Sequence, residues 1–170
     1  GYSMGGPVSQ LLWHRHPDKV AGLVQVATSS RFVPGVRERL VMVTAMSALA
    51  GSTRLGQVAA RVPLRPIQSR IPAAVRSRPD SFTRWAAAEM RRHDPRVVAE
   101  ALAAIGNYDS SRWLKYVDVP TTVLVTGNDH AVPPHEQLRL LVSIPHAQVV
   151  QVSEGHTWCA KPGFGPALGA

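Results

Sequence analysis

The sequence predicts an α/β fold in which a parallel β-sheet is interrupted by a helical region. A helical pattern at residues 5–14 is followed at once by a strand pattern near residues 22–27. The long stretch between residues 28 and 113 contains helical patterns and many prolines but no strand pattern. Two further apolar strands, near residues 121–126 and 148–152, then flank another helical segment.

The first segment, residues 1–29, joins a glycine-rich turn, a helix and a strand. Val8, Leu11 and Leu12 recur at helical spacing, and Pro17 ends the pattern. The strand that follows is apolar on both faces and rich in β-branched residues. This composition is typical of a buried strand in a parallel sheet, so we assign residues 1–29 to a core α/β domain.

Residues 30–113 are predicted to form a helical insertion, because they contain helical patterns and no strand pattern. Glycines and prolines divide this region into short pieces. Helical patterns cover Asp80 to His93 and Asp94 to Gly106, with Asp94 as N-cap and a proline at the first helical position. Residues 114–170 then return to the α/β core. A helix is expected from Glu136 to Ile144, and another is expected to begin near Phe164.

Composition argues against several classes of protein. The net charge of +8 raises the alternative of a nucleic-acid binder, but the arginines are scattered without a recognisable nucleic-acid motif. We therefore expect no nucleic-acid partner. No apolar run reaches the roughly 18 residues of a membrane span. No cysteine or histidine spacing predicts a metal site, no lysine accompanies a phosphate-binding glycine motif, and no cofactor is expected.

Localisation and completeness are open from the sequence. No secretory signal precedes the turn, and the single cysteine, Cys159, excludes an internal disulfide, so a cytoplasmic location is favoured. Because the chain begins at Gly1 with a motif that normally follows a strand, we expect the strands upstream of it to be absent. The sequence predicts no oligomeric state.

The first five residues, Gly1-Tyr2-Ser3-Met4-Gly5, have the form G-x-S-x-G. Glycines on either side permit a sharp turn from strand to helix that lifts the serine hydroxyl clear of the sheet. The turn also places Ser3 at a helix N-terminus, where free N–H groups favour developing negative charge. The pattern alone is weak, but a helix does follow it.

Asp129 and His156 are the expected partners of this serine. Each lies just past the carboxyl end of a predicted strand, where the functional groups of open α/β sheets gather. A serine nucleophile needs a base, and the base needs an orienting carboxylate. The competing histidines are less suitable, because His135 starts a helix, His146 precedes a strand and His130 adjoins the acid.

Three motifs together resemble the α/β-hydrolase superfamily. The first six residues resemble its nucleophile elbow, Gly127 to Pro133 is similar to its acid loop, and Gly155-His156 resembles its histidine loop. The resemblance implies the carboxyl-terminal part of an α/β-hydrolase fold, with residues 30–113 as a cap or lid. It also implies Ser3 as nucleophile, His156 as general base and acid, and Asp129 as orienting carboxylate.

The resemblance extends to the surroundings of the triad. It implies that Met4 gives one backbone N–H to the oxyanion hole, and that the second donor comes from a loop upstream of Gly1. Tyr2, Val132 and Trp158 are candidates for the wall of the substrate pocket, Trp158 because it lies near the histidine. No metal is implied.

The expected function is hydrolysis of a small-molecule carboxylic ester through an acyl-enzyme, as in carboxylesterases and lipases. Ser3 argues against dehalogenation and epoxide opening, because the resemblance implies an aspartate at the elbow for those two reactions. Amide hydrolysis, carbon–carbon bond hydrolysis, cofactor-free peroxidation and acyl transfer to another alcohol stay open. The alternative from another class is an inactive truncated fragment or a noncatalytic binding module of hydrolase descent.

Overall fold

The computed structural model describes residues 1–33, 35–59 and 92–168, and the chain divides into two compact units. The first comprises Gly1–Arg39 and Ile105–Ala170, and the second comprises Leu40–Ala104. The second unit lies within the predicted insertion at residues 30–113, whose role as a cap stays a prediction. No helix in the described ranges combines the length and apolarity that a bilayer span requires.

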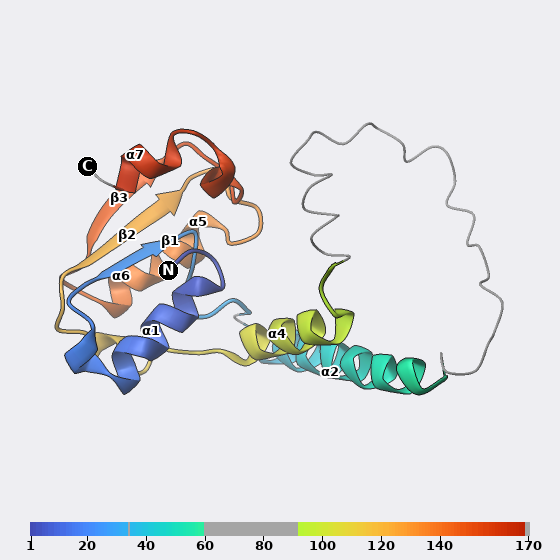
Figure 1. Cartoon of the computed structure of the whole chain (residues 1–170). Coiled ribbons are helices and arrows are strands. Elements are labelled where there is room, and N and C mark those ends of the chain that lie inside the picture. The colour runs from blue at the N-terminus through green and yellow to red at the C-terminus, as the bar shows by residue number, and fades with distance from the viewer. Residues whose placement is uncertain (34, 60–91, 169–170) are drawn as a thin grey trace. The chain divides into compact units, whose positions relative to one another are not determined.

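The first unit is built on a parallel three-stranded sheet with the order β1-β2-β3 (Figure 1). The strands are β1 (Leu23–Val26), β2 (Thr121–Thr126) and β3 (Gln148–Val152), and all three predicted strands are confirmed. Tyr2 forms an isolated parallel bridge with Val26. Because β1 pairs with β2 as well, the start of the chain and β2 both bond to β1.

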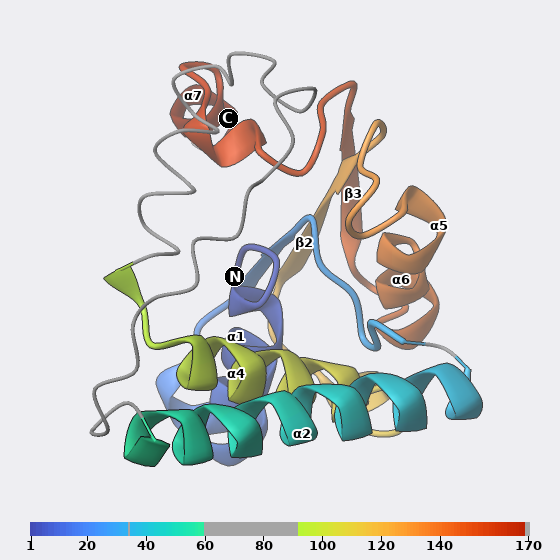
Figure 2. The same ribbon diagram turned by 90° about the vertical axis from the view of Figure 1, so that its right-hand side faces the viewer.

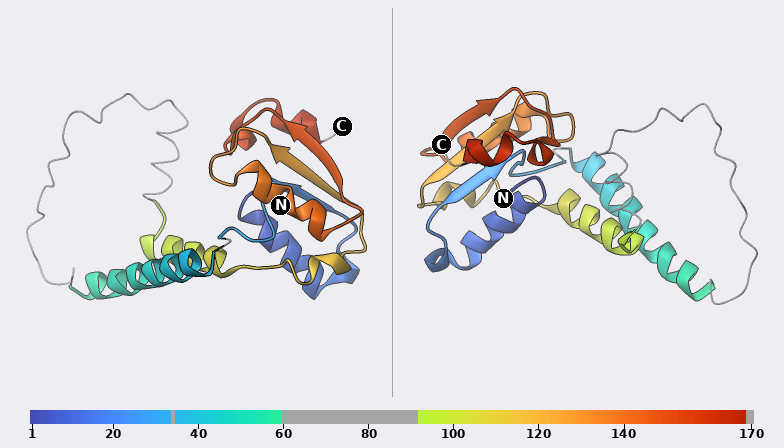
Figure 3. Two further views of the ribbon diagram at one scale, coloured as in Figure 1. Left: turned by 180° about the vertical axis from the view of Figure 1, so that it is seen from behind. Right: turned by 45° about the horizontal axis from the view of Figure 1, so that its top comes forward.

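Helices cover both faces of this sheet. One face carries α1 (Gly5–Arg15) and α6 (Arg139–Ser143), which lie in front of the strands in the left-hand view of Figure 3. The opposite face carries η4 (Trp158–Ala160) and α7 (Phe164–Leu168), seen across the sheet from α6 in Figure 2. The remaining elements of the first unit are η1 (Pro17–Lys19), η3 (Leu114–Tyr116) and α5 (Pro134–Gln137).

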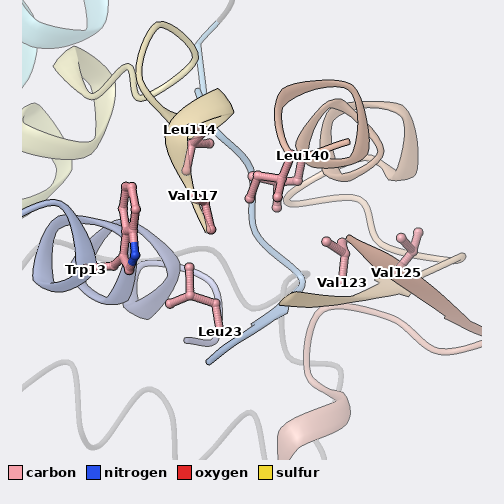
Figure 4. Close-up of a cluster of buried hydrophobic side chains, with 8 residues drawn as sticks. Trp13, Leu23, Leu114, Val117, Val123, Val125 and Leu140 are labelled. Atoms are coloured by element: carbon pink, nitrogen blue, oxygen red, sulfur yellow. The ribbon is translucent and has the colours of Figure 1, made fainter. Parts of the chain in front are cut away.

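Side chains of β2 alternate between two hydrophobic clusters. Val123 and Val125 join the larger cluster, where Leu114, Leu140 and the α1 tryptophan pack against one face of the sheet (Figure 4). Leu124 points to the smaller cluster on the other face and packs with the side chain of Trp158. This two-residue period is the expected geometry of a strand that is buried on both faces.

The buried face of α1 differs from the one that apolar periodicity predicts. Val8 and Leu12 are 63% and 50% exposed and line an open surface pocket. The buried residues of the helix are Gly6, Pro7, Gln10 and Trp13. Gln10 is fully buried because its amide donates to Gln25 Oε1 of β1 at 3.0 Å, and its own Oε1 accepts from Ser110 at 2.7 Å. A satisfied polar side chain therefore lies on the buried face of α1, whereas the predicted apolar residues Val8 and Leu12 are exposed.

The helix expected from Glu136 to Ile144 is two short helices, α5 and α6. The break falls at Leu138, where the N–H of Leu141 donates to the Leu138 carbonyl at 3.1 Å, three residues back in place of four. This tightening follows the 3₁₀ pattern that is common at helix ends. The tail helix expected near Phe164 is confirmed as α7 within the described residues.

The second unit contains most of α2 (Val36–Ala59) and α4 (Pro95–Asn107). The predicted α4 is confirmed, and the carboxylate of Asp94 caps it by accepting from the Arg96 N–H at 2.9 Å. The long α2 was not predicted, because glycines in this region were expected to break helices. The helix nevertheless continues through Gly51, since a glycine in a helix costs only about 1 kcal/mol relative to alanine. The helix expected from Asp80 to His93 lies outside the described residues, apart from its last two positions.

The turn from Gly1 to Gly6 is held in a conformation that few side chains permit. Ser3 has a φ of 49°, in the left-handed region. A Cβ on Gly1 would lie 2.4 Å from the Gly5 carbonyl oxygen, and one on Gly6 would lie 2.1 Å from Thr28 Oγ1. A Cβ on Gly5 would meet nothing within 4 Å. The turn therefore excludes side chains at Gly1 and Gly6, not at Gly5 as the motif spacing suggested.

Leu140 and Leu138 offer a matched test of the core. Leu140 is fully buried against the sheet, whereas Leu138 is 42% exposed in the same helical segment. We expect Leu140→Ala to lower the free energy of unfolding by about 2–5 kcal/mol, because it leaves a cavity. Leu138→Ala should cost about 1 kcal/mol or less. Urea denaturation followed by circular dichroism measures both, and equal losses would contradict this core.

Gly6 and Gly5 offer a second matched pair. Gly6→Ala should lower the free energy of unfolding by about 1–3 kcal/mol, because the new methyl group overlaps the Thr28 side chain. Gly5→Ala should leave it unchanged or raise it by up to about 1 kcal/mol, since alanine is the better helix former. Denaturation midpoints distinguish the two. A greater loss in Gly5→Ala than in Gly6→Ala would contradict this geometry of the turn.

Candidate active site

Three side chains from distant parts of the sequence meet beyond the carboxyl ends of the strands. Ser3 Oγ lies 2.9 Å from Nε2 of His156, and His156 Nδ1 lies 2.8 Å from Oδ2 of Asp129. Ser3 follows the segment that bridges to β1, Asp129 follows β2, and His156 follows β3. The structure therefore brings together the three residues that the sequence singled out.

The carboxylate of Asp129 is buried and surrounded by donors. Its Oδ1 accepts the backbone N–H groups of Ala131 and Val132, each at 2.9 Å. Its Oδ2 accepts from the Thr126 hydroxyl at 2.9 Å and from His156. With Asp129 as acceptor, Nδ1 of a neutral His156 carries the hydrogen, so Nε2 is free to accept the proton of Ser3.

Backbone hydrogen bonds hold the acid loop and the histidine loop side by side. The N–H groups of Gly127 and Asn128 donate to the carbonyls of Val152 and Glu154, at 2.8 and 2.9 Å. The Asn128 side chain adds a hydrogen bond to the Ser153 carbonyl at 3.1 Å. These bonds extend the pairing of β2 and β3 past the ends of the strands, and they fix the distance between Asp129 and His156.

Tyr2 holds the histidine loop from the other side. Its hydroxyl donates to the backbone carbonyl of His156, and its ring meets the Phe164 ring edge-on with centroids 5.6 Å apart. Burial raises the pKa of Tyr2 to about 12, so the phenol stays protonated and remains a donor near neutral pH. The sequence analysis placed Tyr2 at the pocket wall and did not identify this contact.

The other two pocket candidates are buried. Trp158 is 4% exposed and packs with Leu124 and Phe164, and Val132 is 5% exposed beside the acid. A role for Tyr2, Val132 and Trp158 in lining a substrate pocket stays a prediction.

Met4 occupies the position expected of an oxyanion donor. It is the N-cap residue of α1, and the N–H groups of Gly5 and Gly6 turn back to the carbonyls of Tyr2 and Ser3. The Met4 N–H itself donates to no acceptor in the described part of the chain. A free N–H next to the serine, at the positive end of a helix, is suited to binding a negatively charged oxygen.

Two residues that the sequence analysis did not identify contact Asp129. Thr126 ends β2 three residues before the acid, and Gln137 reaches it from α5 with Nε2 3.4 Å from Oδ2. The spacing from Thr126 to Asp129 is visible in the sequence, but nothing in the sequence indicates that Gln137 turns inward.

The competing histidines lie elsewhere. His130 is exposed, His135 pairs with Glu136 at 3.5 Å, and His146 bonds the Val119 carbonyl at 2.9 Å. Among residues 1–33, 35–59 and 92–168, no group of three or more potential metal-binding side chains is found.

Solved structures with a similar fold include three bacterial proteins. A hydrolase from Pseudomonas aeruginosa PA01 superposes with a TM-score of 0.72 at 20% identity, covering 99% of this chain and 61% of the other. The esterase EaEST from Exiguobacterium antarcticum gives 0.70 at 15% identity, covering 99% and 63%. The enol-lactonase from Burkholderia xenovorans LB400 gives 0.61 at 22% identity, covering 99% and 60%. The chain thus spans about three-fifths of the length of these proteins.

Sequence comparison gives the family. No curated protein matches the chain. The sequence profile described as the alpha/beta hydrolase fold, however, matches residues 1–158, which is most of the chain. Together with the parallel sheet and the fold shared with these structures, this match shows that the chain belongs to the alpha/beta hydrolase fold family.

Proposed function

We propose that this chain carries the catalytic triad of a serine hydrolase that cleaves small-molecule carboxylic esters through an acyl-enzyme. The observation that carries the proposal is the continuous hydrogen-bonded series from Ser3 to His156 to Asp129, with links of 2.9 and 2.8 Å. Both distances lie within the range in which a base accepts a proton from a nucleophile. The left-handed turn at Ser3 is also the strained elbow that this chemistry uses.

In the proposed mechanism, His156 Nε2 takes the proton of Ser3 as Oγ attacks the ester carbonyl carbon. The carbonyl double bond opens to a tetrahedral oxyanion, which the Met4 N–H stabilises. Collapse of this intermediate expels the alcohol, which leaves with the proton from His156. Water then attacks the acyl-enzyme with the same histidine as base, and the acid and free Ser3 are released.

Asp129 has a supporting role in this mechanism. Its buried carboxylate holds His156 in the tautomer with hydrogen on Nδ1 and stabilises the imidazolium that forms during the reaction. Hydrogen bonds to its two oxygens keep it oriented, and they come from Ala131, Val132, Thr126, Gln137 and His156. The proton that His156 takes from Ser3 is not passed on to this carboxylate.

Two observations favour esters over the other substrates that this triad could cleave. The similar structures include a protein described as an esterase and one described as an enol-lactonase, and a lactone is a cyclic ester. The elbow residue is a serine, which forms an acyl-enzyme most readily with esters, because an alcohol is a better leaving group than an amine or a carbanion. Amides, carbon–carbon bonds and peroxide chemistry use the same intermediate, and a substrate panel tests them.

Ser3→Ala should abolish labelling by a fluorophosphonate probe and reduce hydrolysis of a short-chain aryl ester by about 10³-fold or more, because the nucleophile is lost. Ser52→Ala, which removes an exposed hydroxyl on α2, is the matched control and should leave both unchanged. Peptide mapping of the labelled protein should identify Ser3. Labelling of Ser3→Ala at the parent rate would contradict the assignment, and no labelling of the parent would favour a noncatalytic protein.

Asp129→Asn should leave the fold intact but slow ester hydrolysis by about 10⁴-fold at saturating substrate, the loss typical of a triad with the wrong histidine tautomer. An amide at this position can donate to Nδ1, which shifts the hydrogen to Nε2 and removes the base that faces Ser3. Asp18→Asn, at an exposed carboxylate, serves as control. A loss below tenfold would remove Asp129 from the triad.

A further inference from the structure

A buried group of polar side chains lies directly behind the proposed acid. Thr126 and Gln137 are fully buried, and Asp129 is 2% exposed. Thr126 comes from the end of β2 and Gln137 from α5. These side chains are shielded from solvent, so their hydrogen bonds must be made to one another or to neighbouring protein groups.

The orientation of the Gln137 amide follows from its two backbone partners. Nε2 lies 2.7 Å from the Val132 carbonyl oxygen, and Oε1 lies 3.0 Å from the Thr126 backbone nitrogen. The opposite orientation would set two acceptors against each other at Val132 and two donors at Thr126. The amide is therefore fixed with Nε2 toward Val132.

This orientation decides what the Thr126 hydroxyl does. The second hydrogen of Gln137 Nε2 points to Thr126 Oγ1, 2.9 Å away. Oγ1 thus accepts from Gln137, and its single hydrogen goes to one of two acceptors. Asp129 Oδ2 lies at 2.9 Å, whereas Gln137 Oε1 lies at 3.3 Å and already accepts from the backbone. The hydroxyl therefore donates to Asp129.

We propose that Thr126 is a positioning residue for the triad: its hydroxyl, directed by Gln137, holds the Asp129 carboxylate toward His156. This inference rests on the proposed function and adds a residue to it. Oδ2 lies closest to two donors, Thr126 Oγ1 at 2.9 Å and His156 Nδ1 at 2.8 Å, with Gln137 Nε2 farther away at 3.4 Å, and its negative charge is shared among them. Without the hydroxyl, Oδ2 binds Nδ1–H more strongly and the carboxylate turns more freely.

Thr126→Val removes the hydroxyl with little change of shape, and Thr126→Ser restores it. Thr122→Val, the same change earlier on β2, is the matched control, since Thr122 makes no hydrogen bond to Asp129. The first readout is the proton resonance of His156 Nδ1–H, assigned by its loss in His156→Gln. The second is the rate of fluorophosphonate labelling per folded molecule, with folding checked by circular dichroism.

In Thr126→Val the resonance should move downfield, because Oδ2 has lost a competing donor. Labelling should slow about tenfold, the loss expected when one hydrogen bond to a charged group is removed. Thr126→Ser should label within about twofold of the parent, as expected when that bond is kept. Thr122→Val should match the parent in both readouts.

The outcomes separate this inference from the proposed function. An unmoved resonance in Thr126→Val overturns the positioning role, whatever the labelling rate. Absence of the resonance in the parent overturns it too, because Asp129 would then not hold Nδ1–H. A parent that neither labels nor hydrolyses esters, but whose resonance moves in Thr126→Val, refutes the proposed function and leaves the positioning role standing.

Discussion

The left-handed backbone at Ser3 is the constraint on which the rest of the site depends. Such a conformation costs about 1–3 kcal/mol for a residue other than glycine, and it persists only where its surroundings enforce it. Here the Ser3 N–H donates to the Val26 carbonyl and the Val26 N–H donates to Gly1, both at 2.9 Å. The Thr28 hydroxyl bonds the Ser3 carbonyl at 2.8 Å from the other side. The serine is thus placed by β1 and by the residues that follow it.

The same sheet sets the distance from the serine to the other two residues. In the register of β2 and β3, Thr126 is paired with Val152. Asp129 lies three residues after Thr126, and His156 lies four residues after Val152. The hydrogen bonds between the two loops continue that pairing. A parallel sheet brings the carboxyl ends of its strands to one edge, which is why residues far apart in sequence can form one hydrogen-bonded series.

The sequence was sufficient to predict the strands and to select the three residues that meet. Apolar β-branched runs gave β1, β2 and β3, and the position of Asp129 and His156 just after two of them gave the convergence. Apolar periodicity gave wrong predictions where apolar side chains are exposed or polar side chains are buried. It did not predict α2, whose exposed Leu40 and Val41 leave no clear apolar stripe, and it chose the wrong face of α1. Neither error concerns a residue that faces Ser3.

The buried contacts of the two glutamines Gln10 and Gln137 could not be predicted from the sequence. Whether a glutamine is buried depends on its partners, because an unpaired buried amide costs about 1–3 kcal/mol whereas a satisfied one costs little. Gln10 is buried because Gln25, Tyr108 and Ser110 complete its hydrogen bonds, and Gln137 because Thr126 and Val132 do so. Burial also raises the pKa of Tyr108 to about 12, so it stays a donor to Gln10 near neutral pH.

These polar pairs have a consequence for the site because they are directional. A hydrophobic contact lets a helix rotate by small amounts, whereas the bond between Gln10 and Gln25 fixes which side of α1 faces β1. Since α1 begins two residues after Ser3, that rotation also sets where the N–H of Met4 points relative to the serine. Gln137 does the same for Asp129 through Thr126. The buried glutamines, which the apolar pattern cannot place, thus act on the helix that follows Ser3 and on the carboxylate of Asp129.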